Sequence, residues 1–253
     1  MKGNSLTGKA SFRPESGDLV PKRSAKIVCI GHSHSRTVYE AALRQNADIT
    51  YLNFWNIPNP VIRGDGEPRF RETVSRALKG SVFSMIGGAS HMIMGLARHP
   101  RPFDFVLPEC PEQPLDAKAE IIPLEAVRAS LLATTQEYLD LIALVRKTSM
   151  GPVFHMEAPP PYEDGDRLLA DIPWMFFEGM QREVSPAAFR FKLWRLHSQI
   201  VRESCRRQGV FFVEHPAESV DANGFLRPEF YFDSMHVNEN YGALLLEQMK
   251  RLA

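Results

Sequence analysis

Short apolar runs alternate along the chain with longer segments of helical periodicity, and this alternation limits the fold more than any other feature. Runs of strand length cover Ala25–Gly31, Ile49–Trp55, Ser81–Gly88, the stretch PVFHMEA at 152–158 and Val210–Glu214. Helical patterns cover Arg36–Gln45, Phe70–Lys79, Leu124–Lys147, Pro186–Gln208 and about Glu239–Leu252. Strands separated by helices are typical of βαβ units, so we expect a parallel five-stranded sheet covered by helices on both faces. Right-handed crossovers bring the carboxyl ends of such strands to one edge, where these folds bind ligands.

Two further segments have weaker patterns. Phe103–Leu107 is a short extended piece in a proline-rich stretch, and LLADIPWMFFEGM (168–180) is unusually apolar for a connection. We expect residues 168–180 either to pack on the core or to form a wall or lid of an apolar pocket. Residues 1–24 hold Lys, Ser, Gly and Pro without an apolar core, so a flexible tail is expected there. Residues 25–253 are long enough for one well-buried domain.

Composition excludes several classes of function. Thirty Lys and Arg balance thirty Asp and Glu, so no overall charge favours nucleic acid or an anionic membrane. No stretch approaches 18 apolar residues, and the first 24 residues lack the apolar core of a secretory signal. Cys29, Cys110 and Cys205 are too few and too far apart for a disulfide framework or a CxxC metal site. A reducing, cytoplasmic location is therefore the simpler interpretation.

Three short polar motifs follow predicted strands or precede the last predicted helix. They are Gly31-His32-Ser33-His34-Ser35, Gly87-Gly88-Ala89-Ser90-His91 and Asp233-Ser234-Met235-His236. An Asp and a His three residues apart can lie on one side of a single turn, where the carboxylate orients the imidazole and stabilises its protonated form. A neutral His is the base that a serine hydroxyl needs in order to act as a nucleophile. Ser33, Asp233 and His236 would form such a set if the last helix lies beside the first strand.

Each motif taken alone also has a structural interpretation. Asp233 could cap the last helix, and His236 could be a surface residue in the first turn of that helix. Serine is common at helix N-termini, so Ser33 by itself is weak evidence for a catalytic nucleophile. It is the joint occurrence of the motifs, in this order and on these elements, that favours catalysis over coincidence.

The same motifs resemble those of the SGNH, or GDSL-type, hydrolases. IGHSHS, SMIGGASH and DSMHVNENYG correspond to the blocks of that family, and the last of them, with its Asp-x-x-His followed by Val-Asn, is the most specific. The resemblance covers most of residues 25–253. It implies a flavodoxin-like three-layer α/β/α fold and an esterase, lipase, thioesterase or acyltransferase activity. It also implies that Ser33 is the nucleophile, His236 the general base and Asp233 the residue that orients it.

The chain departs from the family pattern at two positions. His32 replaces the Asp of the usual Gly-Asp-Ser, and Ala89 replaces the Asn whose amide donates a hydrogen bond to the oxyanion. The loss of one such donor typically lowers the rate by ~10²–10³-fold. Backbone donors remain in Ser33 itself and in a glycine of VIRGDGEP, for which Gly64 is the first choice and Gly66 the second. Ser90, His91 or His32 could replace the missing amide, and the sequence does not rank them.

The motifs and the resemblance together predict a serine hydrolase that acts on carboxylic esters, short-chain or acetyl esters above all, without a cofactor. Its expected substrate is a small-molecule or carbohydrate ester. O-acyl transfer to a carbohydrate hydroxyl is the alternative within the enzyme class, and a catalytically silent binding module is the alternative outside it. The pair His32 and His34 also suggests a metal site, although both residues lie beyond the strand rather than on one face of it. His155 and Glu157 could line the site. No GxGxxG or P-loop pattern follows a strand.

Overall fold

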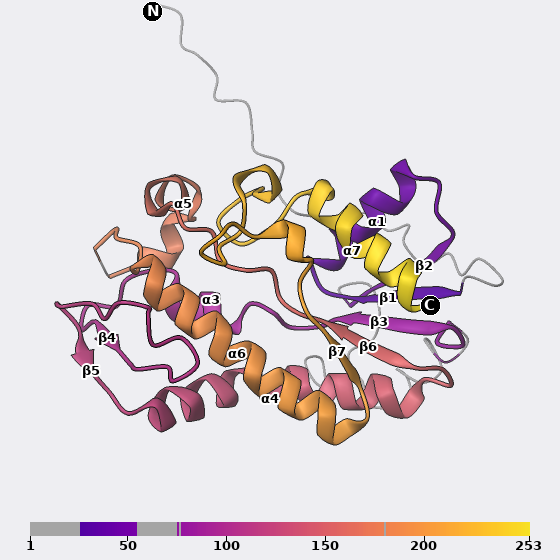
Figure 1. Ribbon diagram of the computed structural model, residues 1–253, viewed down its shortest axis with the longest axis horizontal. Helices are drawn as coiled ribbons and strands as arrows, with labels where there is room; N and C mark the ends of the chain where they lie inside the picture. Colours follow the sequence, from indigo (N-terminus) through magenta and orange to yellow (C-terminus); the bar gives the residue numbers. More distant parts are fainter. Residues whose placement is uncertain (1–25, 55–74, 76, 180) are drawn as a thin grey trace, which may run out of the picture.

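The computed structural model describes residues 26–54, 75, 77–179 and 181–253. Its centre is a parallel sheet of five strands in the order β2-β1-β3-β6-β7 (Figure 1). The strands are β1 (Ile27–Gly31), β2 (Ile49–Asn53), β3 (Ser81–Met85), β6 (Val153–Met156) and β7 (Phe211–Val213). The expected flavodoxin-like, three-layer fold with five parallel strands is confirmed.

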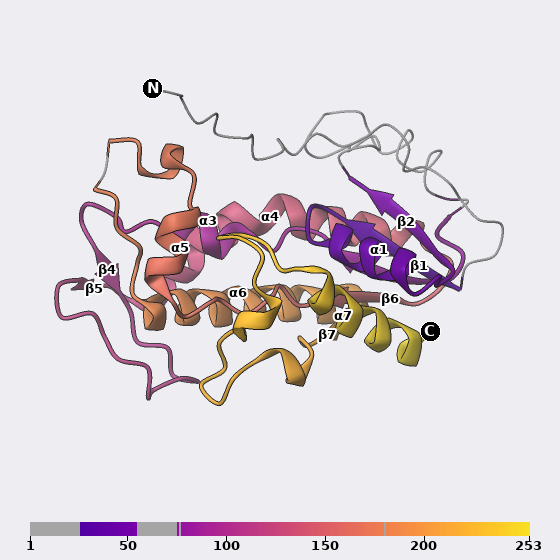
Figure 2. The same cartoon turned by 90° about the horizontal axis from the view of Figure 1, so that it is seen from above.

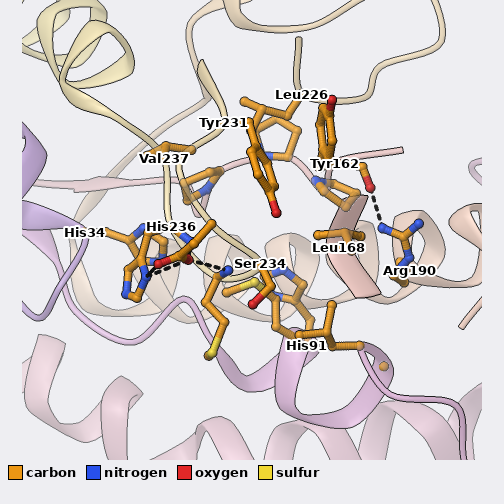
Figure 3. Close-up of a pocket in the computed structure, with 18 residues that line it drawn as sticks. His34, His91, Tyr162, Leu168, Arg190, Leu226, Tyr231, Ser234, His236 and Val237 are labelled. Carbon is orange, nitrogen blue, oxygen red and sulfur yellow. Dashed lines mark hydrogen bonds and ion pairs between the residues drawn. The ribbon is translucent and has the colours of Figure 1, made fainter. Parts of the chain in front are cut away.

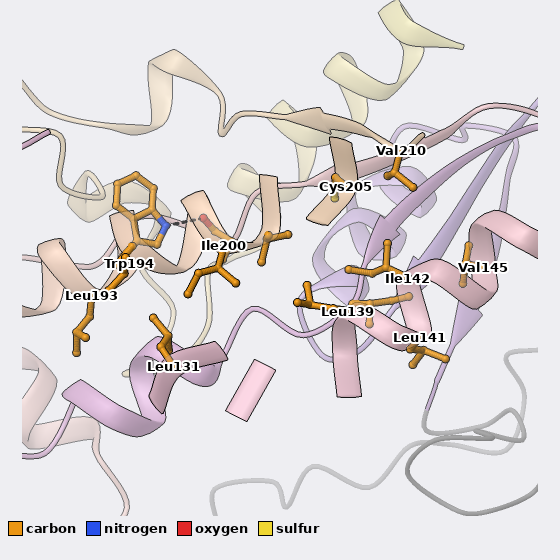
Figure 4. Close-up of a cluster of buried hydrophobic side chains, with 14 of the residues drawn as sticks. Leu131, Leu139, Leu141, Ile142, Val145, Leu193, Trp194, Ile200, Cys205 and Val210 are labelled. Atoms are coloured by element: carbon orange, nitrogen blue, oxygen red, sulfur yellow. Dashed lines mark hydrogen bonds between the residues drawn. The ribbon is translucent and has the colours of Figure 1, made fainter. Parts of the chain in front are cut away.

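Helices cover both faces of the sheet (Figures 1 and 2). The helices α1 (Ser35–Arg44) and α7 (Glu239–Leu252) pack together on one face, and α4 (Leu124–Thr148) and α6 (Ala187–Gln208) pack together on the other. Because successive side chains of a strand point to opposite faces, β1 contributes to two separate cores. Val28 belongs to the cluster beneath α4 and α6, whose side chains Figure 4 shows, and Cys29 belongs to the cluster beneath α1 and α7.

Several short elements have no counterpart in the sequence prediction. They are α3 (Ser90–Gly95), α5 (Gly165–Asp171), β5 (Glu120–Ile121) and the 3₁₀ turns η1 (Trp174–Phe177), η2 (Ala217–Ser219) and η3 (Pro228–Phe230). The weak extended piece near residue 103 forms β4 (Phe103–Asp104), which pairs with β5 outside the main sheet. Of the helix predicted over 70–79, residues 77–79 form a turn and most of the rest lies outside the described residues, as does the tail predicted at 1–24.

Two glycines allow close approaches that build the site. A Cβ at Gly31, the last residue of β1, would lie 2.5 Å from the carbonyl oxygen of Met85 at the end of β3. A Cβ at Gly242 in α7 would lie 2.1 Å from the carbonyl oxygen of Thr37 in α1. Only a residue without a side chain fits at either position. The first contact brings two strand ends together, and the second seats the last helix against the first.

The described part of the apolar segment 168–180 packs in a buried cluster, and one of its residues lines a pocket. Leu168, Ile172 and Phe177 are buried in a third cluster with Leu96 and Tyr231, apart from the two cores of the sheet. Leu168 also lines the pocket described below. None of the helices in the described part of the chain is long and apolar enough to cross a bilayer.

Candidate active site

Asp233 and His236 form a hydrogen-bonded pair in the bend that precedes α7. His236 Nδ1 lies 2.9 Å from Asp233 Oδ1 and 3.0 Å from Oδ2. Asp233 Oδ1 also accepts the backbone N–H groups of Met235 and His236, each at 2.8 Å. The residue that caps α7 is Asn238, whose side chain accepts hydrogen bonds from the first turn of the helix. The carboxylate of Asp233 therefore binds His236 and does not cap the helix.

The charge of Asp233 is favoured by these contacts. Partial burial alone would raise the pKa of this carboxyl, but the hydrogen bonds and charge of His236 and the two backbone donors outweigh burial and hold the pKa below its ordinary value. An ionised Asp233 holds the hydrogen of His236 on Nδ1. Proton exchange with a nucleophile would then pass through Nε2.

The turn between β1 and α1 holds Ser33 at the carboxyl end of the sheet. Ser35 Oγ donates to the carbonyl of His32 at 2.6 Å, and the carbonyl of Ser33 accepts from Arg36 N at 3.1 Å. Ser33 is half-buried, and within the described part of the chain its own amide N–H has no hydrogen-bond acceptor. The hydrogen bonds between described residues do not include one from Ser33 Oγ to His236. The nucleophilic role of Ser33 therefore stays a prediction.

A pocket opens beside the Asp233–His236 pair (Figure 3). Its empty volume, which includes open solvent at the mouth, is about 530 Å³. The surface of the pocket is mostly apolar. Its residues come from α3, from the segments after β6 and before α7, and singly from the start of α1, from α5 and from α6. They are His34, His91, Met92, Gly95, Leu96, Pro159, Pro160, Pro161, Tyr162, Leu168, Arg190, Leu226, Tyr231, Asp233, Ser234, Met235, His236 and Val237. Ser33 is not part of this lining.

Arg190 from α6 stabilises one end of the pocket. Its buried guanidinium donates to the backbone carbonyls of Ser185, Tyr162 and Glu163. Figure 3 shows Arg190 at the opposite end of the pocket from His34 and His236. No sequence pattern indicates Arg190 or Tyr231 as pocket residues, because each joins the pocket through contacts with residues far away along the chain.

The Gly-Gly-Ala turn lies between β3 and α3. Gly87 and Gly88 have positive φ angles of 75° and 91°, which glycine adopts without strain, and Ala89 precedes the first residue of α3. Ser90 is buried, and its hydroxyl donates to the carbonyl of Thr134 in α4 at 3.3 Å. Gly64 and Gly66, the two glycines of VIRGDGEP suggested as backbone donors, lie outside the described residues.

His32 and His34 have separate surroundings. His32 Nδ1 accepts a hydrogen bond from Gly87 N at 3.3 Å, and its ring stacks on Phe54 with centroids 5.2 Å apart. The ring of His34 instead lies 5.5 Å from that of His236. In the part of the chain that the structure describes, no group of three or more His, Cys, Asp or Glu is arranged to hold a metal ion.

Two buried histidines line the pocket in their neutral form. Burial lowers the pKa of His34 to about 3, and it lowers the pKa of His91 well below the ordinary value. His91 lies 5.1 Å from the ring of His197. The sequence suggests His34 as a metal ligand, although its place directly after Ser33 at a strand end is also a signal for a position in the pocket.

His155 and Glu157, which the sequence suggested as further site residues, do not line the pocket. His155 Nδ1 lies 3.2 Å from Ser84 Oγ inside the sheet. The buried carboxylate of Glu157 binds the ring of His215, with 2.6 Å between Oε2 and Nδ1. Both contacts are structural.

No protein-family model matches the chain, and no curated protein matches it. Solved structures similar to it include the periplasmic domain of a lipopolysaccharide acetyltransferase from Salmonella ser. Paratyphi A, with a TM-score of 0.49 and 9% identity, covering 92% of this chain and 85% of that chain. A GDSL-like lipase from Bacteroides thetaiotaomicron has a TM-score of 0.42 and 15% identity, covering 90% and 88%. A carbohydrate acetylesterase from Sinorhizobium meliloti has a TM-score of 0.43 and 12% identity, covering 89% and 97%. Structures described as GDSL-like and esterase enzymes are thus among those that this fold resembles.

Proposed function

We propose that the protein is a serine esterase of the SGNH type, in which Ser33 attacks the ester carbonyl, His236 accepts the serine proton and Asp233 orients His236. The observation that carries this proposal is the hydrogen-bonded Asp233–His236 pair, which lines an open pocket beside His34, the neighbour of Ser33. A carboxylate on one imidazole nitrogen and a pocket beside the other is the arrangement that general-base catalysis requires.

In the proposed reaction the Ser33 hydroxyl proton moves to His236 Nε2 as Oγ bonds to the carbonyl carbon. The carbonyl π electrons move to oxygen, and the N–H of Ser33 is a suitable donor to that oxyanion because no described residue accepts its hydrogen bond. Collapse of the intermediate expels the alcohol, which takes the proton from His236. Water then attacks the acyl-enzyme by the same route.

The pocket supports a small apolar acyl group or alcohol. Leu96, Leu168, Leu226 and Val237 supply apolar surface, and most of the exposed surface of the pocket is apolar. Such a pocket favours a short acyl chain over a charged one. Acyl transfer to a sugar hydroxyl would use the same acyl-enzyme, with an alcohol in place of water.

The direct test is hydrolysis of p-nitrophenyl acetate and butyrate by the wild type and by Ser33→Ala, His236→Ala and Ser149→Ala. We expect Ser33→Ala and His236→Ala each to lower kcat/KM by ~10³-fold or more, because the members of such a set act as one unit. Ser149 at the end of α4 donates to Val145 O, outside the pocket, so Ser149→Ala should match the wild type.

Covalent labelling supplies a second readout. A fluorophosphonate should add to the wild type at Ser33, as peptide mass analysis would show, and should not add to Ser33→Ala. Retained hydrolysis in Ser33→Ala, or loss of activity with a chelator, would contradict the proposal. No hydrolysis and no labelling of the wild type would favour a binding module.

A further inference from the structure

The Gly87-Gly88-Ala89 turn leaves the oxyanion of the proposed mechanism one hydrogen-bond donor short, and this is the gap that another residue would have to fill. A methyl group stands at Ala89, where an amide donor to the oxyanion is expected, so the negative charge in the transition state would lack one hydrogen bond. A side chain from elsewhere can fill the gap only if a donor atom faces the pocket. This inference rests on the proposed function, since it concerns the oxyanion formed in that reaction.

Three neighbouring polar side chains do not meet this requirement. The Ser90 hydroxyl is directed to Thr134 O in α4. His32 accepts from Gly87 N, and its ring packs between Phe54 and Tyr138 rather than in the pocket lining. His91 does line the pocket, but both of its ring nitrogens are buried from solvent and, among the described residues, have no hydrogen-bond partner.

His34 has the required position. Its ring lines the pocket, with its centroid 5.5 Å from that of His236. His34 Cδ2 also lies 3.9 Å from the position that a Cβ of Gly88 would take. Figure 3 shows His34 beside His236 at one end of the pocket. The imidazole therefore lies close to both the general base and the glycine turn.

We propose that His34 supplies the oxyanion hydrogen bond that Ala89 cannot supply. The tautomer with hydrogen on Nε2 would donate into the pocket, because Nδ1 is buried and has no hydrogen-bond partner among the described residues. The hydrogen stays on His34 throughout, and the only proton transferred during attack is the one that passes from Ser33 to His236. A neutral imidazole can act as such an electrophilic donor.

The protonation state of His34 agrees with this role. Burial and the nearby His236 both lower the pKa of His34, to about 3, with Asp233 opposing them and His32 adding a smaller decrease. His34 therefore stays neutral when His236 becomes protonated during attack. It does not compete with His236 for the serine proton.

The test is a double-mutant cycle of His34→Ala with Ala89→Asn, measured as kcat and KM on p-nitrophenyl acetate. We expect His34→Ala to lower kcat by ~10²-fold with little change in KM, because the lost interaction exists mainly in the transition state. Ala89→Asn should raise kcat by ~10-fold or more in the His34→Ala background and add little to the wild type. His34→Gln, which keeps an N–H donor, should retain more activity than His34→Ala.

A second readout needs no turnover. The rate at which a fluorophosphonate labels Ser33 should fall in His34→Ala and recover in the double variant. If Ser33 is essential but His34→Ala keeps kcat within ~3-fold of the wild type, the role of His34 is overturned and the proposed esterase stands. A second outcome would also overturn the role of His34. In this outcome kcat falls equally in His34→Ala and His34→Gln and does not recover when Ala89→Asn is added, although all variants keep the wild-type circular dichroism spectrum. Activity that survives Ser33→Ala would instead overturn the proposed function.

Discussion

Asp233 satisfies two demands at once, because its carboxylate closes a backbone turn and holds an imidazole. It accepts the N–H groups of Met235 and His236 and the ring hydrogen of His236. Asp221 is a natural comparison, since it accepts the N–H groups of Asn223 and Phe225 in a similar turn. The two aspartates differ in whether a histidine ring is also bound.

This difference leads to a prediction about Asp233→Asn. The amide can still accept from the backbone, but it cannot stabilise a protonated His236 and it favours the wrong tautomer, so kcat should fall by ~10²-fold or more. Asp221→Asn should leave kcat unchanged. Steady-state kinetics on p-nitrophenyl acetate, with unfolding curves for both variants, would check this. Equal kcat in the two variants would show that Asp233 only shapes its turn.

At the scale of secondary structure, the site depends on how α7 packs on α1. The turn with Asp233 and His236 enters α7, and the turn with Ser33 enters α1, so the helix pair sets the distance between the two turns. Because Gly242 has no side chain, α7 can approach α1 until the two backbones are in contact at Gly242 and Thr37. About two hundred residues separate the two turns in the sequence, so tertiary packing, not sequence proximity, brings them together.

Gly242→Ala should therefore damage both stability and activity. The added methyl would lie 2.1 Å from Thr37 O, and the helices would have to separate at a cost of about 1–3 kcal/mol in the free energy of unfolding. Gly165→Ala in α5 is the control, because its methyl would meet no atom within 4 Å. Urea unfolding and ester hydrolysis would be measured for both. A Gly242→Ala variant as stable and active as the wild type would contradict the close packing.

The elements that the sequence predicted correctly are those with long or strongly buried patterns. The expected last helix agrees with α7 at both ends, and β1, β3 and α6 lie within a few residues of their expected bounds. The helices α3 and α5 were missed because six and seven residues give less than two full turns of periodicity. The position of His34 beside His236 could not be derived from sequence, because it depends on ring direction and on the packing of two distant helices.

On the scale of the whole molecule, the interior holds several neutral imidazoles. Burial lowers the pKa of His34 and His155 to about 3 and that of His32 and His197 to about 4. Among the described residues, neither ring nitrogen of His197 has a hydrogen-bond partner. In the unfolded chain each of these groups would take up a proton near pH 6.5.

Stability should therefore decrease in acid. Between pH 6.5 and about 4 the unfolded chain binds protons that the folded protein excludes, so the free energy of unfolding falls as pH falls, by up to about 1.4 kcal/mol per pH unit for each such histidine. Urea unfolding at pH 7, 6 and 5 would measure the slope. His197→Leu should reduce the slope, whereas His99→Gln, at an exposed position, should not. A free energy of unfolding that stays constant from pH 7 to pH 5 would contradict the buried, neutral state.

The hydrogen bonds of Arg190 also bear on which esters the pocket would accept. Its guanidinium joins the chain at Tyr162 and Glu163 to the chain at Ser185, so the pocket wall at Tyr162 is held at a fixed separation from Ser185. If the pocket widened there, the buried guanidinium would lose its hydrogen-bond acceptors, and this would cost free energy. The shape of the pocket would then decide which acyl groups are accepted. Along a series of p-nitrophenyl esters with longer and longer acyl chains, the rate of hydrolysis should drop sharply at one chain length instead of declining evenly.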